Sequence, residues 1–242
     1  MKATTVTGLL AFCLLLAGCS SPPPAPQTLR IGLSPGAQPV SAAISVCIPP
    51  SENLAVSIKT GYPNVVDLND YDVYIQLGEP DKLPDFVAPL ARDNIVVVLH
   101  PSNNVELGLE QTADLFSGGV QDWAELGGAS GSAQLWVGPA GDEARQSFEE
   151  RVLRGNPVAG WAHLAANPKD LLAVVAEDPA AAGILPMAWV DKSVAAVDLG
   201  LQLPVLALAL EEPTGPAREL LACLQGQVGQ EAIAERYTPY SP

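Results

Sequence analysis

Side chains able to act as nucleophiles, bases or metal ligands are few in this chain, and their spacing does not suit such chemistry. His100 and His163 are its only imidazoles, one before a proline and the other in a segment expected to be helical, so packing or surface roles are expected for both. The segment 128–132 lacks the final glycine of the turn that exposes a serine nucleophile. The aspartates in residues 67–72 lack the glycine and the terminal glutamate of a calcium loop. The sequence therefore predicts no catalytic residue, no metal site and no cofactor.

The remaining reactive side chains are four cysteines, and two of these lie near the N-terminus. Residues 8–17 are almost wholly apolar and follow Lys2, a pattern typical of a secretory signal peptide and too short for a membrane-spanning helix. This stretch ends in Leu16-Ala17-Gly18-Cys19, which resembles the lipobox of bacterial lipoproteins. The resemblance implies that residues 1–18 are a signal peptide and that Cys19, carrying a lipid on its thiol, is the first mature residue.

A short tether follows the lipidated cysteine. Residues 20–27 are rich in proline, which favours an extended, semi-rigid spacer with nothing to bury. We expect residues 19–28 to hold the folded part a short distance from the membrane. Acyl chains contribute ~0.8 kcal/mol for each buried methylene, so the lipid would fix the protein to the extracytoplasmic face of a membrane.

Cys47 and Cys223 remain, because Cys13 leaves with the signal peptide. An even pair in an oxidising compartment can form a disulfide. The two residues can equally be separate buried thiols, since cysteine is often buried. The sequence by itself leaves both alternatives open.

The net charge of −15 excludes some classes of partner. Nucleic acid is not expected, because its affinity for proteins comes largely from Lys and Arg on phosphates. Adhesion to anionic lipid is not expected either, so a lipid on Cys19 would have to provide the anchoring. Residues 28–242 are numerous enough for one large domain or two small α/β lobes.

Strands and helices alternate along the chain from Leu29 onward, which predicts α/β layers with mostly parallel sheets. The continuous apolar run Ile95–Leu99 is typical of a buried strand. The patterns predict strands at 29–33, 54–58, 71–77, 94–100, 134–137, 182–186 and 203–210, and helices at 39–47, 110–116, 121–126, 142–153, 170–177, 215–225 and 228–237.

Several motifs occur in the order found in one known family. His100-Pro101 follows the apolar strand, then come Leu109–Gly118 and Trp123-Ala124-Glu125-Leu126, and later Ala180–Pro186 and Gln230–Pro239. Together they resemble PstS-like, phosphate-type solute-binding proteins of ABC importers. The resemblance is strong from Asn94 onward and thin before it.

The resemblance implies a type II periplasmic-binding-protein fold, in which two α/β lobes are joined by two crossing strands and a ligand lies between them. The crossings would fall near 99–102 and 195–203. Lobe 1 would comprise 29–99 plus 203–242, and lobe 2 would comprise 100–202. Cys47 and Cys223 then share a lobe, which favours their disulfide. A monomer with an ABC permease as partner is implied.

The ligand positions depart from the family pattern. Relatives hold an anion with hydroxyls and helix N-termini, but the positions of a Ser-Gly-Thr-Arg helix start hold Asp142-Glu143-Ala144-Arg145. A carboxylate there satisfies the free N–H groups itself and repels an anion, so tight phosphate binding is not expected. Arg145 would either offset that charge or pair with Glu149. The candidate ligand residues are Ser34, Gly36, Thr60, Gly61, Tyr62, Gln76, Glu79, Gly141, Asp142, Glu143 and Arg145.

Two functions fit these observations. The first is capture of a small solute in the interlobe cleft for an ABC permease. The second is a scaffold that has lost its ligand chemistry and binds a protein partner, or senses one, at the membrane.

Overall fold

The structure is a computed structural model, and it describes residues 27–50 and 53–240. The predicted signal peptide, Cys19 and most of the predicted tether lie outside the described residues. Gln27 and Thr28, the last two residues of the predicted tether, belong instead to the first strand, where they pair with Leu54 and Ala55. No helix in the described part of the chain is long and apolar enough to cross a membrane.

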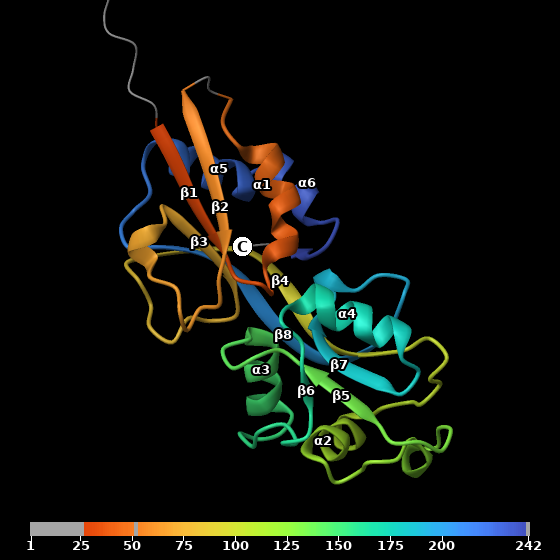
Figure 1. The fold of residues 1–242 in the computed structure, drawn as a ribbon. Helices are drawn as coiled ribbons and strands as arrows, with labels where there is room; N and C mark the ends of the chain where they lie inside the picture. The colour runs from red at the N-terminus through yellow and green to blue at the C-terminus, as the bar shows by residue number, and fades with distance from the viewer. Residues whose placement is uncertain (1–26, 51–52, 241–242) are drawn as a thin grey trace, which may run out of the picture.

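A single mixed sheet runs through the part of the chain that the structure describes (Figure 1). Its order is β2-β1-β3-β8-β4-β7-β5-β6, with β9 paired to β4. The expectation of mostly parallel pairing was wrong, because β4 and β8 run antiparallel to every strand beside them, whereas β1 with β2 and β3, and β5 with β6 and β7, are parallel. The strands are β1 (Gln27–Leu33), β2 (Leu54–Thr60), β3 (Val73–Leu77), β4 (Phe86–Leu99), β5 (Gln134–Val137), β6 (His163–Leu164), β7 (Ala181–Pro186), β8 (Ala195–Ala209) and β9 (Thr238–Pro239).

The helices gather at the two ends of this sheet (Figure 1). We call β1, β2, β3, α1, α5 and α6 the first lobe, and β5, β6, β7, α2, α3 and α4 the second lobe. The helices are α1 (Ser41–Cys47), α2 (Leu109–Ser117), α3 (Glu143–Arg151), α4 (Pro168–Glu177), α5 (Gly215–Gln225) and α6 (Gln227–Ile233), with short 3-10 turns η1 (Gln38–Val40), η2 (Leu68–Asp70), η3 (Trp123–Leu126) and η4 (Met187–Trp189).

The long strands β4 and β8 pair with each other along both lobes. Ala91 and Arg92 of β4 lie between β8 and β9, whereas Ile95–Leu99 lies between β8 and β7 of the second lobe. The register shifts between Ile95 and Val96, at the change of neighbour. These two strands carry the chain between the lobes, and the numbered boundaries given above stay a prediction.

The apolar run of β4 is buried on both faces, as its pattern predicted. Ile95, Val97 and Leu99 belong to the main core, while Val96 and Val98 belong to a second cluster that includes residues of α4 and β7. Ile95–Leu99 is therefore an internal strand segment, between β7 and β8, that is covered on both faces.

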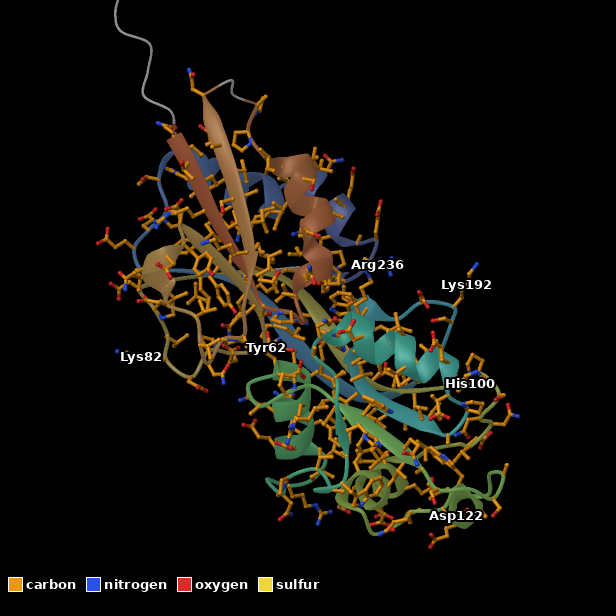
Figure 2. The ribbon with its side chains drawn as sticks, viewed as in Figure 1. Tyr62, Lys82, His100, Asp122, Lys192 and Arg236 are labelled. Carbon is orange, nitrogen blue, oxygen red and sulfur yellow. A yellow bond between two sulfur atoms is a disulfide. The ribbon has the colours of Figure 1, made fainter. Side chains whose placement is uncertain are left out.

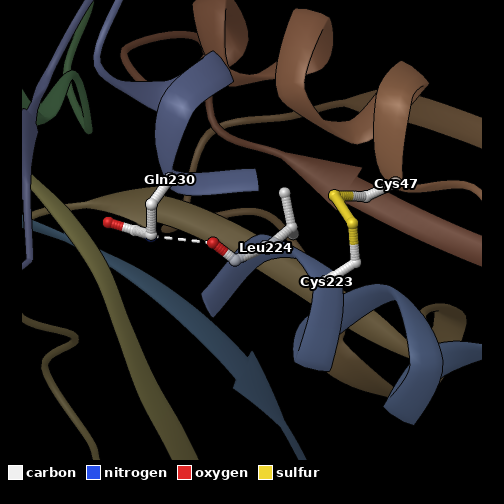
Figure 3. The surroundings of a disulfide bond; sticks show 4 residues. All are labelled: Cys47, Cys223, Leu224 and Gln230. Carbon is white, nitrogen blue, oxygen red and sulfur yellow. Dashed lines mark hydrogen bonds between the residues drawn. A yellow bond between two sulfur atoms is a disulfide. The ribbon is translucent and has the colours of Figure 1, made fainter. Parts of the chain in front are cut away.

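The disulfide between Cys47 and Cys223 joins α1 to α5 across the first lobe (Figure 3). Its Cα atoms are 5.5 Å apart, within the usual range for a disulfide. Beside it, the Gln230 side-chain amide donates to the carbonyl oxygens of Leu224 at 2.7 Å and Leu90 at 3.1 Å. The helices at the end of the chain are therefore fixed both to α1 and to β4.

Candidate ligand cleft

The first wall of the cleft is the edge at which β1, β2 and β3 end. Parallel strands bring their carboxyl ends to one edge, where α/β sheets bind ligands. Ser34 follows β1 and is fully buried, and its hydroxyl oxygen accepts hydrogen bonds from the backbone N–H groups of Ala37 and Leu77, both at 3.3 Å. The turn from Ser34 to Gly36 is thus fixed against the end of β3.

The second wall is the turn that leads from β5 into α3. Gly141 has φ +92°, a conformation that favours glycine, and a Cβ there would collide with the Asn64 side chain of the first lobe. Asp142 caps α3 by accepting from the Arg145 backbone N–H at 2.8 Å. The helix start is therefore satisfied by the protein's own carboxylate, as the sequence predicted.

Arg145 does not face the first lobe. Its Nε donates to Glu149 Oε1 at 2.9 Å, and its Nη1 donates to the Gly138 carbonyl at 3.1 Å. Glu149 in turn accepts from the Val158 backbone N–H at 3.1 Å. Of the two roles left open for Arg145, pairing at the i,i+4 position is the one observed.

Glu143, the first residue of α3, places its carboxyl group against the first lobe. Only 7% of the residue is exposed, and a Cβ on Gly36 would lie 3.5 Å from its Oε2, so the carboxyl covers the Ser34–Gly36 turn. Neither carboxyl oxygen has a hydrogen-bond partner of acceptable geometry among the described residues. The Glu143 side chain is therefore a buried acceptor with unmet bonding capacity.

Burial disfavours the charged forms of both acids at this turn. Burial, and next the charge of Asp142, raise the pKa of Glu143 to about 8, against a weaker opposing effect of the nearby Ser34 hydroxyl and Leu77 N–H. Burial also raises the pKa of Asp142 to about 6, while the Arg145 N–H and guanidinium oppose the shift. At neutral pH Asp142 is largely ionised and Glu143 is largely protonated.

A cavity of about 360 Å³ lies beside Glu143, between the two lobes. From the second lobe it is lined by one face of α3, and from the first lobe by β3 and the loop after it. Its lining residues are Pro63, Asn64, Val66, Leu68, Tyr74, Gln76, Leu77, Gly78, Glu79, Pro80, Asp81, Lys82, Glu143, Gln146, Ser147, Glu150, Arg151, Leu203 and Leu208.

Direct hydrogen bonds also join the two lobes. The Tyr62 hydroxyl, which Figure 2 shows where the lobes meet, donates to the Ala166 carbonyl at 3.1 Å. The Trp189 indole N–H donates to the Pro35 carbonyl at 3.1 Å. The Asn64 amide donates to the Ala140 carbonyl at 3.4 Å. The structure is therefore a closed arrangement of the two lobes.

The predicted ligand residues occupy four kinds of position. Gln76, Glu79 and Glu143 line the cavity, and Glu79 is exposed at its rim. Ser34, Gly36, Gly61, Tyr62, Gly141 and Asp142 lie at the lobe junction outside its lining, Thr60 is exposed at the end of β2, and Arg145 is turned to Glu149. Their role as ligand contacts stays a prediction.

Sequence reasoning missed two polar residues near the lobe junction, Ser147 and Asp93. Ser147 lines the cavity one helical turn after Glu143, and the spacing of four residues was the signal that could have revealed it. Asp93 is buried where β4 passes between the lobes and accepts from the Ala188 and Asn94 N–H groups at 3.1 and 2.8 Å. Burial raises the pKa of Asp93 to about 7, against these two hydrogen bonds. The sequence signal for Asp93 was an acid two residues before the apolar run Ile95–Leu99.

His163 was expected in a helix, and this was wrong. It lies in the two-residue strand β6, paired with β5, and its ring stacks on Trp136 with centroids 4.7 Å apart. It is remote from the cavity lining, in a stacked surface position.

Comparison with solved structures shows the same fold in solute-binding proteins. A protein described as a phosphate ABC transporter substrate-binding protein from Clostridium perfringens, solved with bound phosphate, superposes with a TM-score of 0.80 at 18% identity, covering 89% of this chain and all of the other. An ABC-type phosphate transport receptor from Vibrio cholerae gives 0.64 at 18% identity over 87% and 100% of the two chains. The reduced OxyR regulatory domain from Pseudomonas aeruginosa gives 0.56 at 14% identity over 84% and 98%. No curated protein matches the sequence.

A family model agrees with the fold. The model of the PBP superfamily domain matches residues 86–231, which is more than half of the chain. That range includes both long strands and the whole second lobe. The chain therefore belongs to the PBP superfamily and has the type II periplasmic-binding-protein fold.

Proposed function

We propose that this protein is the solute-binding component of an ABC importer, that it is held at the extracytoplasmic face of a membrane by a lipid on Cys19, and that it captures a small solute between its lobes. The observation that carries the proposal is the interlobe cavity, which is lined by buried polar side chains and sits in a fold shared with substrate-binding proteins. Its volume is at the lower end of the range for small-molecule sites. Binding and delivery, not catalysis, is the proposed activity.

Phosphate is not the solute we expect. The Glu143 carboxyl covers the Ser34–Gly36 turn, after which the Ala37 N–H already donates to Ser34, and the Asp142 carboxylate already accepts from the Arg145 N–H at the start of α3, where relatives would bind an anion. Asp142 is ionised at neutral pH, and a like charge 4 Å away at an effective dielectric of 20 costs about 4 kcal/mol, or roughly a thousandfold in affinity. Arg145 offers little compensation, because it is bound to Glu149.

A thermal-shift screen of the full-length protein tests the proposal. Anions, amino acids, sugars, amines and divalent cations would each be added at millimolar concentration. A solute present at 100 times its Kd stabilises the folded state by about 2.7 kcal/mol, which raises the melting temperature measurably. A rise with some class supports solute binding, and no rise with any class contradicts it.

A scaffold that binds a protein partner is the second candidate. The bonds from Tyr62 to Ala166 and from Trp189 to Pro35 join the lobes directly, and Glu143 occupies the space over the first-lobe turn. A protein held closed by its own side chains has no need of a solute to close it. A thermal-shift screen in which no compound raises the melting temperature would favour the scaffold function.

The anchor is tested separately, by replacing Cys19 with Ala. The wild-type protein should incorporate labelled fatty acid and sediment with membranes, whereas the variant should carry no label. If the Cys19→Ala variant still incorporated labelled fatty acid, the lipid would be attached to another residue.

A further inference from the structure

Two buried polar side chains on one face of α3 face the cavity without partners. Glu143 and Ser147 are one helical turn apart, are 7% and 6% exposed, and both line the cavity. Within the described residues, neither the carboxyl oxygens of Glu143 nor the hydroxyl oxygen of Ser147 has a hydrogen bond of acceptable geometry, although the Ser34 hydroxyl and the Leu77 N–H lie near Glu143. Buried polar atoms are nearly always paired, so unpaired ones at a cavity point to a group that comes from outside the chain.

Beyond the Ser34 hydroxyl and the Leu77 N–H, which lie near Glu143, the first-lobe lining of the cavity adds acceptors. Gln76 is buried and lines the cavity, and its amide nitrogen donates to the Gly78 carbonyl at 3.3 Å, which leaves the amide oxygen as an acceptor. The Tyr74 hydroxyl, on the same wall, donates to the Gly61 carbonyl at 2.7 Å. The deep part of the cavity is therefore complementary to a ligand that carries hydrogen-bond donors.

No cation of the chain is placed to satisfy Glu143 within the described residues. Arg145 bonds to Glu149, and Arg151 is exposed and donates to the Gln202 carbonyl at 3.2 Å. Lys82 is exposed at the rim, toward the outer edge of the first lobe in Figure 2. These two cations at the rim are outnumbered by the acids of the lining, which are Glu79, Asp81, Glu143 and Glu150.

On the basis of the proposed solute-binding function, we propose that the cleft takes a small organic cation, with an ammonium group bound by Glu143 and a polar substituent within reach of Ser147. An ammonium group supplies three donors and a positive charge, which matches a carboxylate, a hydroxyl and an amide oxygen. A doubly negative phosphate supplies neither the three donors nor the positive charge. The cavity of about 360 Å³ limits the ligand to a small molecule.

Binding should release a proton from Glu143. Its pKa of about 8 means that only a minority of the protein carries the carboxylate at pH 7, while most carries it at pH 8.5. Asp142, with a pKa of about 6, is largely ionised throughout this window. The other charged or titratable side chains around the cavity are Tyr74, Glu79, Asp81, Lys82, Glu150 and Arg151. An aliphatic ammonium resembles lysine and stays charged across the window. Affinity should therefore rise about eightfold from pH 7 to pH 8.5.

Calorimetry of the full-length protein tests this with five probes: ethanolamine, 1,4-diaminobutane, choline, 1,2-ethanediol and inorganic phosphate. We expect one or both of the first two to bind, choline to bind more weakly because it has no N–H donor, and the diol and phosphate not to bind. Glu143→Gln should weaken binding at pH 8.5 by about tenfold or more, since a charge-assisted hydrogen bond is lost. Ser147→Ala should weaken ethanolamine binding severalfold.

Glu110→Gln is the matched control, because it makes the same change at an exposed position on α2. It should bind the probes as the wild type does. Absence of binding by both ammonium probes, or binding that Glu143→Gln does not change, overturns the cation assignment. If another solute class then stabilises the protein, the proposed function stands without it; if none does, both fail.

Discussion

Glu143 is an acid that folding makes harder to ionise. In the unfolded chain its pKa would be near 4.5, whereas burial beside Asp142 raises it to about 8 in the folded protein. The folded state therefore binds a proton that the unfolded state has already lost over the pH range between these values. Within that range, stability must fall as pH rises.

Glu143→Gln should remove much of this pH dependence. For the wild type, the stability attributable to protonated Glu143 is fully present below pH 4.5 and is lost by pH 8, with an upper limit of about 5 kcal/mol at about 1.4 kcal/mol per pKa unit. Urea unfolding between pH 5 and pH 8.5 would measure it. The variant should have a shallower slope, with the remaining slope due to Asp93 and Asp142. Glu110→Gln should keep the wild-type slope, and equal slopes for all three proteins would contradict the assigned burial.

For individual residues, the sequence predicted which chemical groups lie at the start of α3 better than it predicted what surrounds them. The Asp142-Glu143 pair at a helix start indicated that carboxylates replace an anion, and Asp142 does cap α3. The sequence did not separate the roles of the two acids, because only the packing of the lobes buries Glu143 against the Ser34–Gly36 turn. The partner of Arg145 was open for the same reason.

The turn between β5 and α3 is the element that sets how closely the lobes approach. Gly141 has a positive φ, and Asn64 of the first lobe packs directly over it. Any side chain at residue 141 is therefore opposed by backbone strain and by contact across the cleft.

Gly141→Ala should destabilise the protein more than Gly155→Ala does. Gly155 has a similar φ of +84° but nothing near its Cβ position, so it reports strain alone, roughly 1–2 kcal/mol. The excess cost at Gly141, on the order of 1 kcal/mol, should disappear when Asn64 is also replaced by Ala. Denaturant midpoints of the single and double variants measure both parts, and equal costs for the two glycine variants would show that the lobes do not press on this turn.

Elements with continuous apolar or helical periodicity were predicted well, as β5 and α5 show by matching the observed bounds. The first half of β4 was not predicted, because Pro89, Arg92 and Asp93 interrupt its apolar pattern and its neighbours are remote in sequence. The two residues of β6 are exposed and are ordered by pairing with β5, a tertiary effect with no local signal.

The molecule as a whole consists of two lobes that share one sheet through β4 and β8 and meet again across the cleft. The shared strands resist separation of the lobes, whereas the cleft contacts are single hydrogen bonds of about 0.5–1.5 kcal/mol each. Opening of the cleft by bending near Asp93 is therefore the motion we expect.

Trp189→Phe should shift the protein toward an open arrangement. The change keeps an aromatic ring but removes the donor to the Pro35 carbonyl, so the ratio of open to closed molecules should rise about two- to tenfold. Small-angle X-ray scattering would show a larger radius of gyration. Trp161→Phe, at a residue that is 40% exposed, is the control and should scatter as the wild type does. An unchanged radius for Trp189→Phe would mean that the bond does not hold the cleft shut.

The Cys47–Cys223 disulfide spans 176 positions of the chain, from a helix near the beginning to one near the end. It makes most of the folded protein a covalent ring. A protease that cuts one loop anywhere inside this ring leaves a single molecule, since both pieces remain attached through sulfur. If the protein is held at the extracytoplasmic face of a membrane, as proposed, proteases are common there and reductants scarce. This closure would then keep the second lobe attached after a cut that would otherwise release it.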